Sequence, residues 1–128
     1  MIDRARIERL LWRLYAARLG GDLEGLCREF TQDAKFKIVG VSRHVSPVAV
    51  TAVGIGEIRQ WLSLLLRTFQ LSNQTILSMI IENEKAAVQW QASIYSKISG
   101  VSVLTELVDL VETRDGRINS YTEFAIPR

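Results

Sequence analysis

The last third of the chain consists of three runs in which apolar and polar residues alternate. In the first run, Val88, Trp90 and Ala92 fall on one face, and Gln89 and Gln91 fall on the other. Alternation with period two is typical of β-strands that have one buried face. Short turn signals separate the runs, so the pattern predicts an antiparallel meander of long strands. The predicted strands span residues 86–98, 101–113 and 118–126.

The first half of the chain carries apolar residues at helical spacing instead. Between residues 7 and 17 they form one stripe, and the arginines, Arg18 among them, fall mostly outside it. Gly20 and Gly21 predict the end of this helix, because glycine adopts the left-handed conformation at little steric cost. Asp22 is a favourable N-cap for a second helix that we expect to run to about Phe30.

The middle of the chain alternates between the two patterns. Residues 34–38 predict a short strand, and the segment from Gly40 to Gly54 fits a loop, a ragged strand or both. After Gly56 the apolar residues return to helical spacing, with Trp61 and Phe69 on one predicted face. A further strand over 74–81 and a polar turn at 82–84 then lead into the meander.

Length and charge restrict the kinds of protein this chain resembles. Its 128 residues are enough for one domain, 1–128, with a single core. The net charge is only +2, so we expect no nucleic-acid partner. Cys27 is the single cysteine, which leaves no disulfide or cysteine metal site and favours a reducing, cytoplasmic setting.

The N-terminal segment has no apolar run long enough for a signal peptide or a membrane span. Its arginines form a basic amphipathic helix, which is also compatible with a transit peptide or a membrane-surface segment. We interpret it as a core helix that contacts no membrane, because its apolar stripe is what packing against a sheet requires.

Three motifs in this order resemble one superfamily. They are LYAARLGGDLEGLCREFTQDAKF at 14–36, GIGEIRQWL at 54–62 and VDLVETRDGRI at 108–118. The chain resembles the nuclear transport factor 2-like superfamily, and within it the SnoaL-like polyketide cyclases and the ketosteroid isomerases. The resemblance implies an α+β fold: a cone-shaped, curved antiparallel sheet wrapped around amino-terminal helices, also described as a cystatin-like α+β barrel. It also implies a homodimer formed through the outer sheet face.

In ketosteroid isomerases an aspartate base works beside an oxyanion-binding tyrosine and a protonated aspartic acid. The resemblance assigns each of these three catalytic positions to a residue of this chain. The tyrosine position falls on Leu14, and Tyr15 beside it is turned about 100° around the helix, so the oxyanion tyrosine is expected to be missing. The base position falls on Ile38, which cannot accept a proton. The third position falls on Asp109, or on Val108 if no gap is allowed. The steroid isomerase reaction is therefore not expected.

Turn geometry predicts which side chains share the cavity. A two-residue turn at Ser99-Gly100 sets Asp109 opposite Trp90 and Leu107 opposite Ala92. A three-residue turn with Gly116 in a bulge then sets Tyr121 opposite Asp109, with Glu123 opposite Leu107. A strict two-residue turn at this second corner points the other face inward, and the resemblance supports the bulged form. The inward residues of the alternative are Ser120, Thr122 and Phe124.

The candidate catalytic residues are Asp109, Glu123 and Tyr121. Two carboxyls and a phenol in an apolar pocket are typical of acid–base sites, because burial and mutual repulsion raise at least one pKa. The alternative is that both carboxyls pair with arginines or face water on the outer sheet face. His44 is a further candidate base or substrate clamp if the segment 40–54 covers the cavity mouth, and otherwise a solvated residue.

We expect a small apolar molecule as the partner, held without a cofactor or a metal. The sequence has no glycine-rich phosphate loop, nucleophile elbow or metal-ligand cluster. Three hypotheses remain open: an isomerase, cyclase, dehydratase or hydrolase of an apolar oxygenated substrate, a binding protein that has lost the chemistry, and an interaction domain that uses its outer sheet. The expected ligand-binding residues are Leu14, Ile38, Trp61, Trp90, Ala92 and Leu107.

Overall fold

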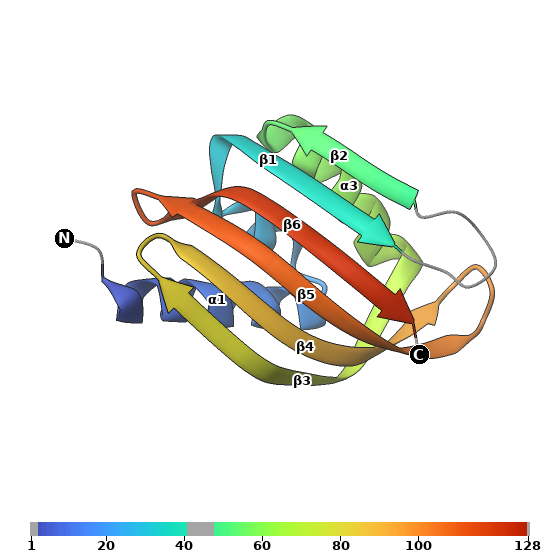
Figure 1. Cartoon of the computed structure of the whole chain (residues 1–128). Helices are drawn as coiled ribbons and strands as arrows, with labels where there is room; N and C mark the ends of the chain where they lie inside the picture. Colours follow the sequence, from blue (N-terminus) through green and yellow to red (C-terminus); the bar gives the residue numbers. More distant parts are fainter. Residues whose placement is uncertain (1–2, 41–47, 128) are drawn as a thin grey trace.

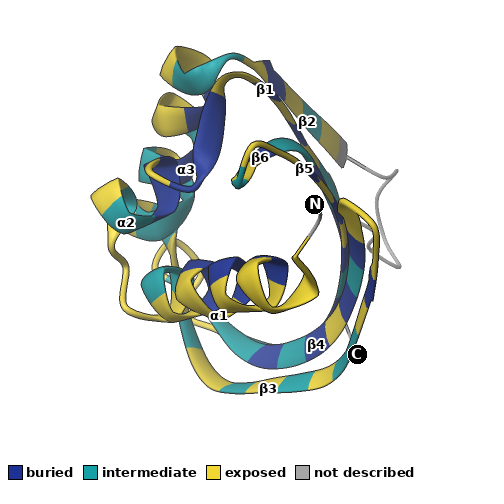
Figure 2. Cartoon of the chain, turned by 90° about the vertical axis from the view of Figure 1, so that its left-hand side faces the viewer, coloured by how far each residue is buried: buried dark blue, intermediate teal, exposed yellow. Residues whose placement is uncertain are grey.

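The computed structural model of the chain describes residues 3–40 and 48–127. These residues form an α+β fold in which helices lie inside one strongly curved sheet of six strands (Figures 1 and 2). The strand order is β2-β1-β6-β5-β4-β3, with β1 and β6 parallel and all other neighbours antiparallel. The elements are α1 (Arg4–Leu19), α2 (Leu23–Cys27), β1 (Phe30–Gly40), β2 (Val48–Val53), α3 (Ile55–Thr68), β3 (Phe69–Glu82), β4 (Lys85–Ser96), β5 (Ser102–Arg114) and β6 (Arg117–Pro127).

Asp3 is the N-cap of α1, and its carboxylate accepts hydrogen bonds from the backbone N–H groups of Ala5 and Arg6. The predicted apolar stripe packs against the sheet, and the buried residues of α1 are Ile7, Leu10, Leu11, Leu14 and Tyr15. Asp22 caps α2 as predicted, accepting from the N–H of Gly25 at 3.0 Å. The expectation that this helix runs to Phe30 is wrong, because Phe30 already pairs with Ile118 in the sheet.

The middle of the chain contains more strand than the sequence pattern indicated. The segment after Gly40 returns as β2, which pairs with β1, while residues 41–47, and with them His44, lie outside the described residues. Phe69 opens β3 and does not belong to the helix, because its backbone is already extended. Among the described residues, no helix is long and apolar enough to cross a membrane.

The register of the meander differs from the expectation, although the inward faces are right. Asp109 pairs with Val88, and Leu107 pairs with Trp90, each two residues from the expected partner, because the β4–β5 loop includes residues 97–101. A shift of two residues leaves every side chain on its predicted face.

The β5–β6 turn combines features of the bulged form and the strict two-residue form that the sequence left open. The β5–β6 turn has two residues, Asp115 and Gly116, whose φ angles of 52° and 80° lie in the left-handed region. The bulge lies further along, where the register shifts between Glu112 and Thr113. Glu123 therefore faces Asp109 instead of Leu107, and Tyr121 faces Val111 instead of Asp109. The bulge restores the inward orientation that a strict two-residue turn would have reversed.

Burial changes along the concave side of the sheet (Figure 2). At the level of Asp109 and Trp90 the inward side chains are fully buried. Further along the strands, toward the C-terminal ends of β1, β4 and β6, they are only half-buried. The half-buried inward positions include Ile38, Ile94, Val103 and Ala125, and Trp61 of α3 is also half-buried. The core is therefore closed at one end and more open at the other.

Candidate functional site

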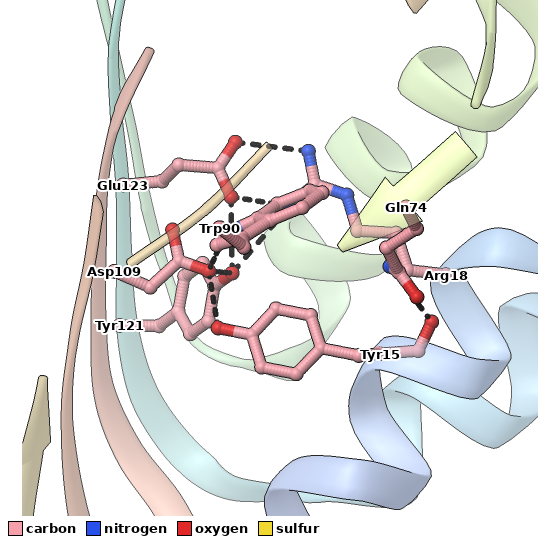
Figure 3. Close-up of polar contacts among 7 residues, drawn as sticks. All are labelled: Tyr15, Arg18, Gln74, Trp90, Asp109, Tyr121 and Glu123. Carbon is pink, nitrogen blue, oxygen red and sulfur yellow. Dashed lines mark hydrogen bonds and ion pairs between the residues drawn. The ribbon is translucent and has the colours of Figure 1, made fainter. Parts of the chain in front are cut away.

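Polar side chains from one helix and three strands meet inside the curved sheet (Figure 3). Asp109 of β5 and Glu123 of β6 pair across neighbouring strands, and they are 0% and 1% exposed. Such complete burial of two carboxyls is unusual and requires specific partners. The partners come from α1, β4 and β6, and they are Tyr15, Arg18, Trp90 and Tyr121.

One oxygen of Asp109 collects nearly all the hydrogen bonds of this carboxyl. Oδ2 lies 2.6 Å from the Tyr15 hydroxyl, 2.6 Å from the Tyr121 hydroxyl and 2.8 Å from the indole N–H of Trp90. Oδ1 is buried and has no hydrogen-bond partner among the described residues. Burial, and then the negative charge of Glu123, raise the pKa of Asp109 well above its ordinary value.

The pKa of Glu123 is shifted in the opposite direction, because a cation faces this carboxyl. The Arg18 guanidinium donates to both carboxylate oxygens, from Nη1 to Oε2 and from Nη2 to Oε1, the latter at 2.9 Å. The Tyr121 hydroxyl lies 3.0 Å from Oε2. Burial alone would raise the pKa of Glu123, but the charge and hydrogen bonds of Arg18 outweigh burial and lower it.

The pKa values of the two neighbouring carboxyls are therefore shifted in opposite directions. Burial favours the protonated form of Asp109, and Arg18 favours the carboxylate form of Glu123, which is the difference in environment that separates an acid from a base. Burial and the nearby carboxyls also raise the pKa of Tyr15 and Tyr121, so both phenols stay neutral. Aromatic rings enclose the group: Arg18 lies 4.9 Å from the centre of the Trp90 ring, and the Tyr15 ring meets Trp90 edge to face.

The structure brings together three of the residues selected from the sequence, Asp109, Tyr121 and Glu123, on the concave face. The alternative that both carboxyls lie on the outer sheet face is wrong, although an arginine does pair with Glu123. The expected ligand-binding residues Leu14, Trp90, Ala92 and Leu107 are buried in the same core, and Ile38 and Trp61 are half-buried against it. His44 lies outside the described residues and stays a prediction.

Sequence reasoning missed Tyr15 and Arg18. The expectation that Tyr15 is turned away from the site is wrong, because its hydroxyl lies 2.6 Å from Oδ2 of Asp109. Gln74 of β3 also donates to the backbone carbonyl oxygen of Tyr15, at 3.3 Å. Arg18 was assigned to the polar side of the helix, yet it follows Leu14 by four positions and Leu11 by seven. That spacing places a charged residue on the apolar stripe, and it is the signal that would have found Arg18.

Comparison with known families agrees with this architecture. The model of the SnoaL-like domain, of the nuclear transport factor 2-like superfamily, matches residues 11–121. The chain belongs to the SnoaL-like family. A search of curated proteins gave no match. Among the described residues of this SnoaL-like protein, no group of three or more His, Cys, Asp or Glu side chains is placed to hold a metal ion.

Solved structures show the same fold at low sequence identity. A nuclear transport factor 2-like protein from Burkholderia xenovorans has a TM-score of 0.78 and 17% identity, covering 98% of this chain and 92% of that one. A putative isomerase from Bacillus subtilis has a TM-score of 0.77 and 18% identity, with coverages of 94% and 88%. An LEH-like epoxide hydrolase from Mycobacterium tuberculosis has a TM-score of 0.70 and 12% identity, with coverages of 94% and 83%.

Proposed function

We propose that this SnoaL-like protein is a cofactor-independent enzyme that transfers protons on a small, apolar, oxygen-containing molecule, as an isomerase, cyclase or dehydratase does. The observation that carries the proposal is the pairing of Asp109 with Glu123 across β5 and β6, with opposite pKa shifts, in an apolar interior. Perturbed carboxyls in such a setting are typical of acid–base sites. The similarity of fold to a putative isomerase and to an LEH-like epoxide hydrolase supports an enzyme of this general kind.

The charge balance of the site favours a neutral ligand. Arg18 carries one positive charge, Glu123 one negative charge, and protonated Asp109 none. A carboxylate or phosphate ligand would add a buried charge without a counter-ion, which is costly in an apolar interior. A carbonyl, hydroxyl or epoxide oxygen needs only a hydrogen-bond donor. Protonated Asp109 supplies that donor, and Glu123 is the group that accepts a proton.

The rest of the ligand would contact the more open part of the interior. There the inward side chains are half-buried and apolar, including Ile38, Trp61 and Ala125. Side chains of this kind bind hydrocarbon rings by excluding water. We therefore propose that the ligand oxygen points toward Asp109 and that its hydrocarbon part lies among these residues. His44 remains the predicted further contact at this end.

Two test reactions examine this proposal. The steroid isomerase reaction was not expected from the sequence, because Ile38 cannot act as its base, but Glu123 beside Asp109 is a carboxylate that can accept the proton instead. We therefore expect the protein to convert 3-cyclohexenone to 2-cyclohexenone, followed by ultraviolet absorbance. Hydrolysis of cyclohexene oxide, followed by gas chromatography, tests the related acid–base reaction in which water is the nucleophile. Asp109→Asn and Glu123→Gln should each reduce the rate by about 10²- to 10⁴-fold, as removal of a general acid or base does. Asp115→Asn, in the exposed β5–β6 turn, is the matched control and should retain the rate. If the unchanged protein converts neither compound faster than Asp109→Asn does, the proposal is contradicted.

A carrier without chemistry is the second candidate. Apolar Leu14 and Ile38, at positions where the resemblance placed catalytic side chains, favour it. Titration calorimetry with 2-cyclohexenone and with cyclohexanol separates the two. Binding that Trp61→Ala abolishes, without turnover of either test substrate, would favour the carrier.

We also propose that a second copy of the chain covers the outer sheet face. This face exposes Ile80, Leu110 and Phe124. One cross-strand row runs through Glu82, Lys85, Glu112, Ser120 and Lys35. Lys85 and Glu112 form an ion pair within it, which leaves acidic Glu82 toward one end and basic Lys35 toward the other. A copy turned by a two-fold axis would set the acidic end against the basic end.

Light scattering should give the mass of a dimer for the unchanged protein. We expect Phe124→Glu to give a monomer, because it introduces a charge into the proposed apolar contact. Trp12→Glu, a similar change on the exposed side of α1, is the control and should leave a dimer. A monomer in the unchanged protein would contradict the proposal.

A further inference from the structure

Arg18 uses only part of its guanidinium in contacts with the rest of the chain. A guanidinium has five N–H groups in one plane. One N–H of Nη1 and one of Nη2 donate to the two carboxylate oxygens of Glu123, and Nη1 also lies 3.4 Å from the Tyr121 hydroxyl. Nε–H and the second N–H of Nη2 have no acceptor among residues 3–40 and 48–127. These two donors lie side by side along one edge of the planar group, the Nε–Nη2 edge.

The same edge of another arginine holds a carboxylate in this protein. Nε of Arg13 donates to Oε2 of Glu29 at 2.9 Å, and Nη2 of Arg13 donates to Oε1 at 3.1 Å. Two parallel hydrogen bonds from a charged donor make such an edge a strong site for oxygen acceptors. Arg18 offers the equivalent edge, but its own carboxylate partner binds the two Nη nitrogens instead (Figure 3).

The Nε–Nη2 edge belongs to the most accessible member of the polar cluster. The side chain of Arg18 is 18% exposed, whereas that of Glu123 is 2% exposed. Among the described residues, the buried side-chain atoms without a hydrogen-bond partner are Oδ1 of Asp109 and Oδ1 of Asn119. Nε of Arg18 also has no partner but is not one of these buried atoms, so solvent reaches it. A molecule that enters the interior therefore meets this edge before it meets Asp109.

Two contacts fix the direction of the edge. The Cζ atom of Arg18 lies 4.9 Å from the centre of the Trp90 ring, and Glu123 binds both Nη nitrogens. Trp90 and Glu123 are themselves buried, at 0% and 1% exposure. Donors that already point in a fixed direction lose little conformational freedom when a ligand binds. The edge is therefore preorganised for an acceptor.

We propose that the Nε–Nη2 edge of Arg18 is a binding site for the carbonyl oxygen of a neutral ligand, such as a ketone, an ester or a lactone. The lone pairs of a carbonyl oxygen lie in one plane, so this oxygen accepts from both N–H groups. An anion fits less well, because Glu123 already compensates the charge of Arg18. An alcohol brings a hydrogen that needs an acceptor of its own in apolar surroundings.

This site goes beyond the proposed function, because a carrier needs such a contact as much as an enzyme does. It rests on the proposed function only in requiring a small-molecule ligand inside the curved sheet. In a ligand that also reaches Asp109, the carbonyl group on Arg18 is a second oxygen function. The site thus narrows the ligand from oxygen-containing molecules in general to carbonyl compounds.

Nitrogen–proton NMR of the full chain labelled with ¹⁵N tests the site, because it observes the Nε–H group of each arginine. Cyclohexanone and methylenecyclohexane share one ring shape, but only the ketone has an acceptor oxygen. We expect cyclohexanone to shift the Arg18 signal saturably, and methylenecyclohexane to leave it in place. The Nε–H of Arg13, already bonded to Glu29, is the internal control and should respond to neither compound. An Arg18 signal that responds to neither compound, or equally to both, would overturn the proposal.

A substitution gives a second, independent test. Arg18→Lys keeps a positive charge beside Glu123, but one nitrogen replaces the planar fork. Titration calorimetry should show affinity for cyclohexanone lowered about 10- to 100-fold, and affinity for methylenecyclohexane retained. Arg13→Lys is the matched control and should change neither affinity. Equal losses for the two compounds in Arg18→Lys would mean that Arg18 acts only through packing, which contradicts the proposal.

The NMR titration of the unchanged protein decides the question if Arg18→Lys does not fold. These readouts concern binding, so their outcome is separate from that of the activity assays. A carbonyl-dependent shift of the Arg18 signal without turnover would reject the proposed enzyme and retain the site. Turnover that depends on Asp109, without any shift of the Arg18 signal, would reject the site and retain the enzyme.

Discussion

The two faces of the same sheet hold glutamates in opposite situations. On the concave face, Glu123 is 1% exposed and is held by Arg18. On the outer face, the side chain of Glu112 is 50% exposed and lies 3.5 Å from Lys85. Both glutamates form ion pairs with a basic residue of another element, but water screens only the outer pair. The comparison shows that burial, more than residue type, distinguishes the carboxyl of Glu123 in the candidate site from that of Glu112 on the surface.

The largest expected difference between the faces is in folding stability. Glu123→Ala leaves the Arg18 charge in a mostly buried place without its partner, which should cost about 3 kcal/mol of unfolding free energy. Glu112→Ala removes an exposed pair and should cost less than about 1 kcal/mol. Urea denaturation at pH 7 measures both. Equal losses in the two variants would show that the Arg18 pair is as well solvated as the outer one.

The next largest effect is the pH dependence of stability. Because the pKa of Asp109 is raised in the folded state, the unfolded chain releases this proton first as the pH rises, and stability falls between the unfolded pKa, about 3.9, and the folded pKa. The slope from one proton is at most about 1.4 kcal/mol per pH unit. Glu123 acts in the opposite direction, since its lowered pKa adds stability that is lost as the pH falls through it.

Urea denaturation from pH 4 to pH 8 measures this slope. We expect Asp109→Asn to flatten the decline, because asparagine cannot ionise. Asp115→Asn, a change of the same type in an exposed turn, should leave the curve unchanged. An equal slope in the unchanged protein and in Asp109→Asn would mean that Asp109 ionises normally in the fold.

The smallest expected effect is the loss of one hydroxyl. Tyr15→Phe removes one of the donors to Asp109 while keeping the ring, and it should cost about 1 kcal/mol. Tyr95→Phe, at a tyrosine that is 38% exposed, should change stability by less than about 0.5 kcal/mol. Thermal denaturation followed by circular dichroism ranks the two. A Tyr95 variant that is less stable than the Tyr15 variant would contradict the assignment.

The fold was predictable where periodicity is strong. The alternating runs gave the meander and its inward faces, and the motif order indicated the family. Register was not predictable to the residue, because the loop before Ser102 and the bulge near Asn119 are set by tertiary packing as well as by turn residues. Both shifts nevertheless preserved the faces of Asp109, Tyr121 and Glu123.

The candidate site was only partly predictable. The strands supplied Asp109, Tyr121 and Glu123, since alternation fixes which side chains share a face. Tyr15 and Arg18 come from a helix whose arginines were interpreted as lying mostly outside its apolar stripe. A long arginine side chain can extend from the edge of an apolar stripe to a buried carboxylate, and only the packed arrangement of helix and sheet shows that it does.

The central claim is that one buried carboxyl is protonated beside an ionised one, and infrared spectroscopy tests it most directly. At pH 7, the difference spectrum between the unchanged protein and Asp109→Asn should contain the C=O band of a protonated carboxyl. The corresponding difference for Asp115→Asn should contain only carboxylate bands. A spectrum in which Asp109→Asn also removes only carboxylate bands would contradict the assignment of Asp109 as the acid.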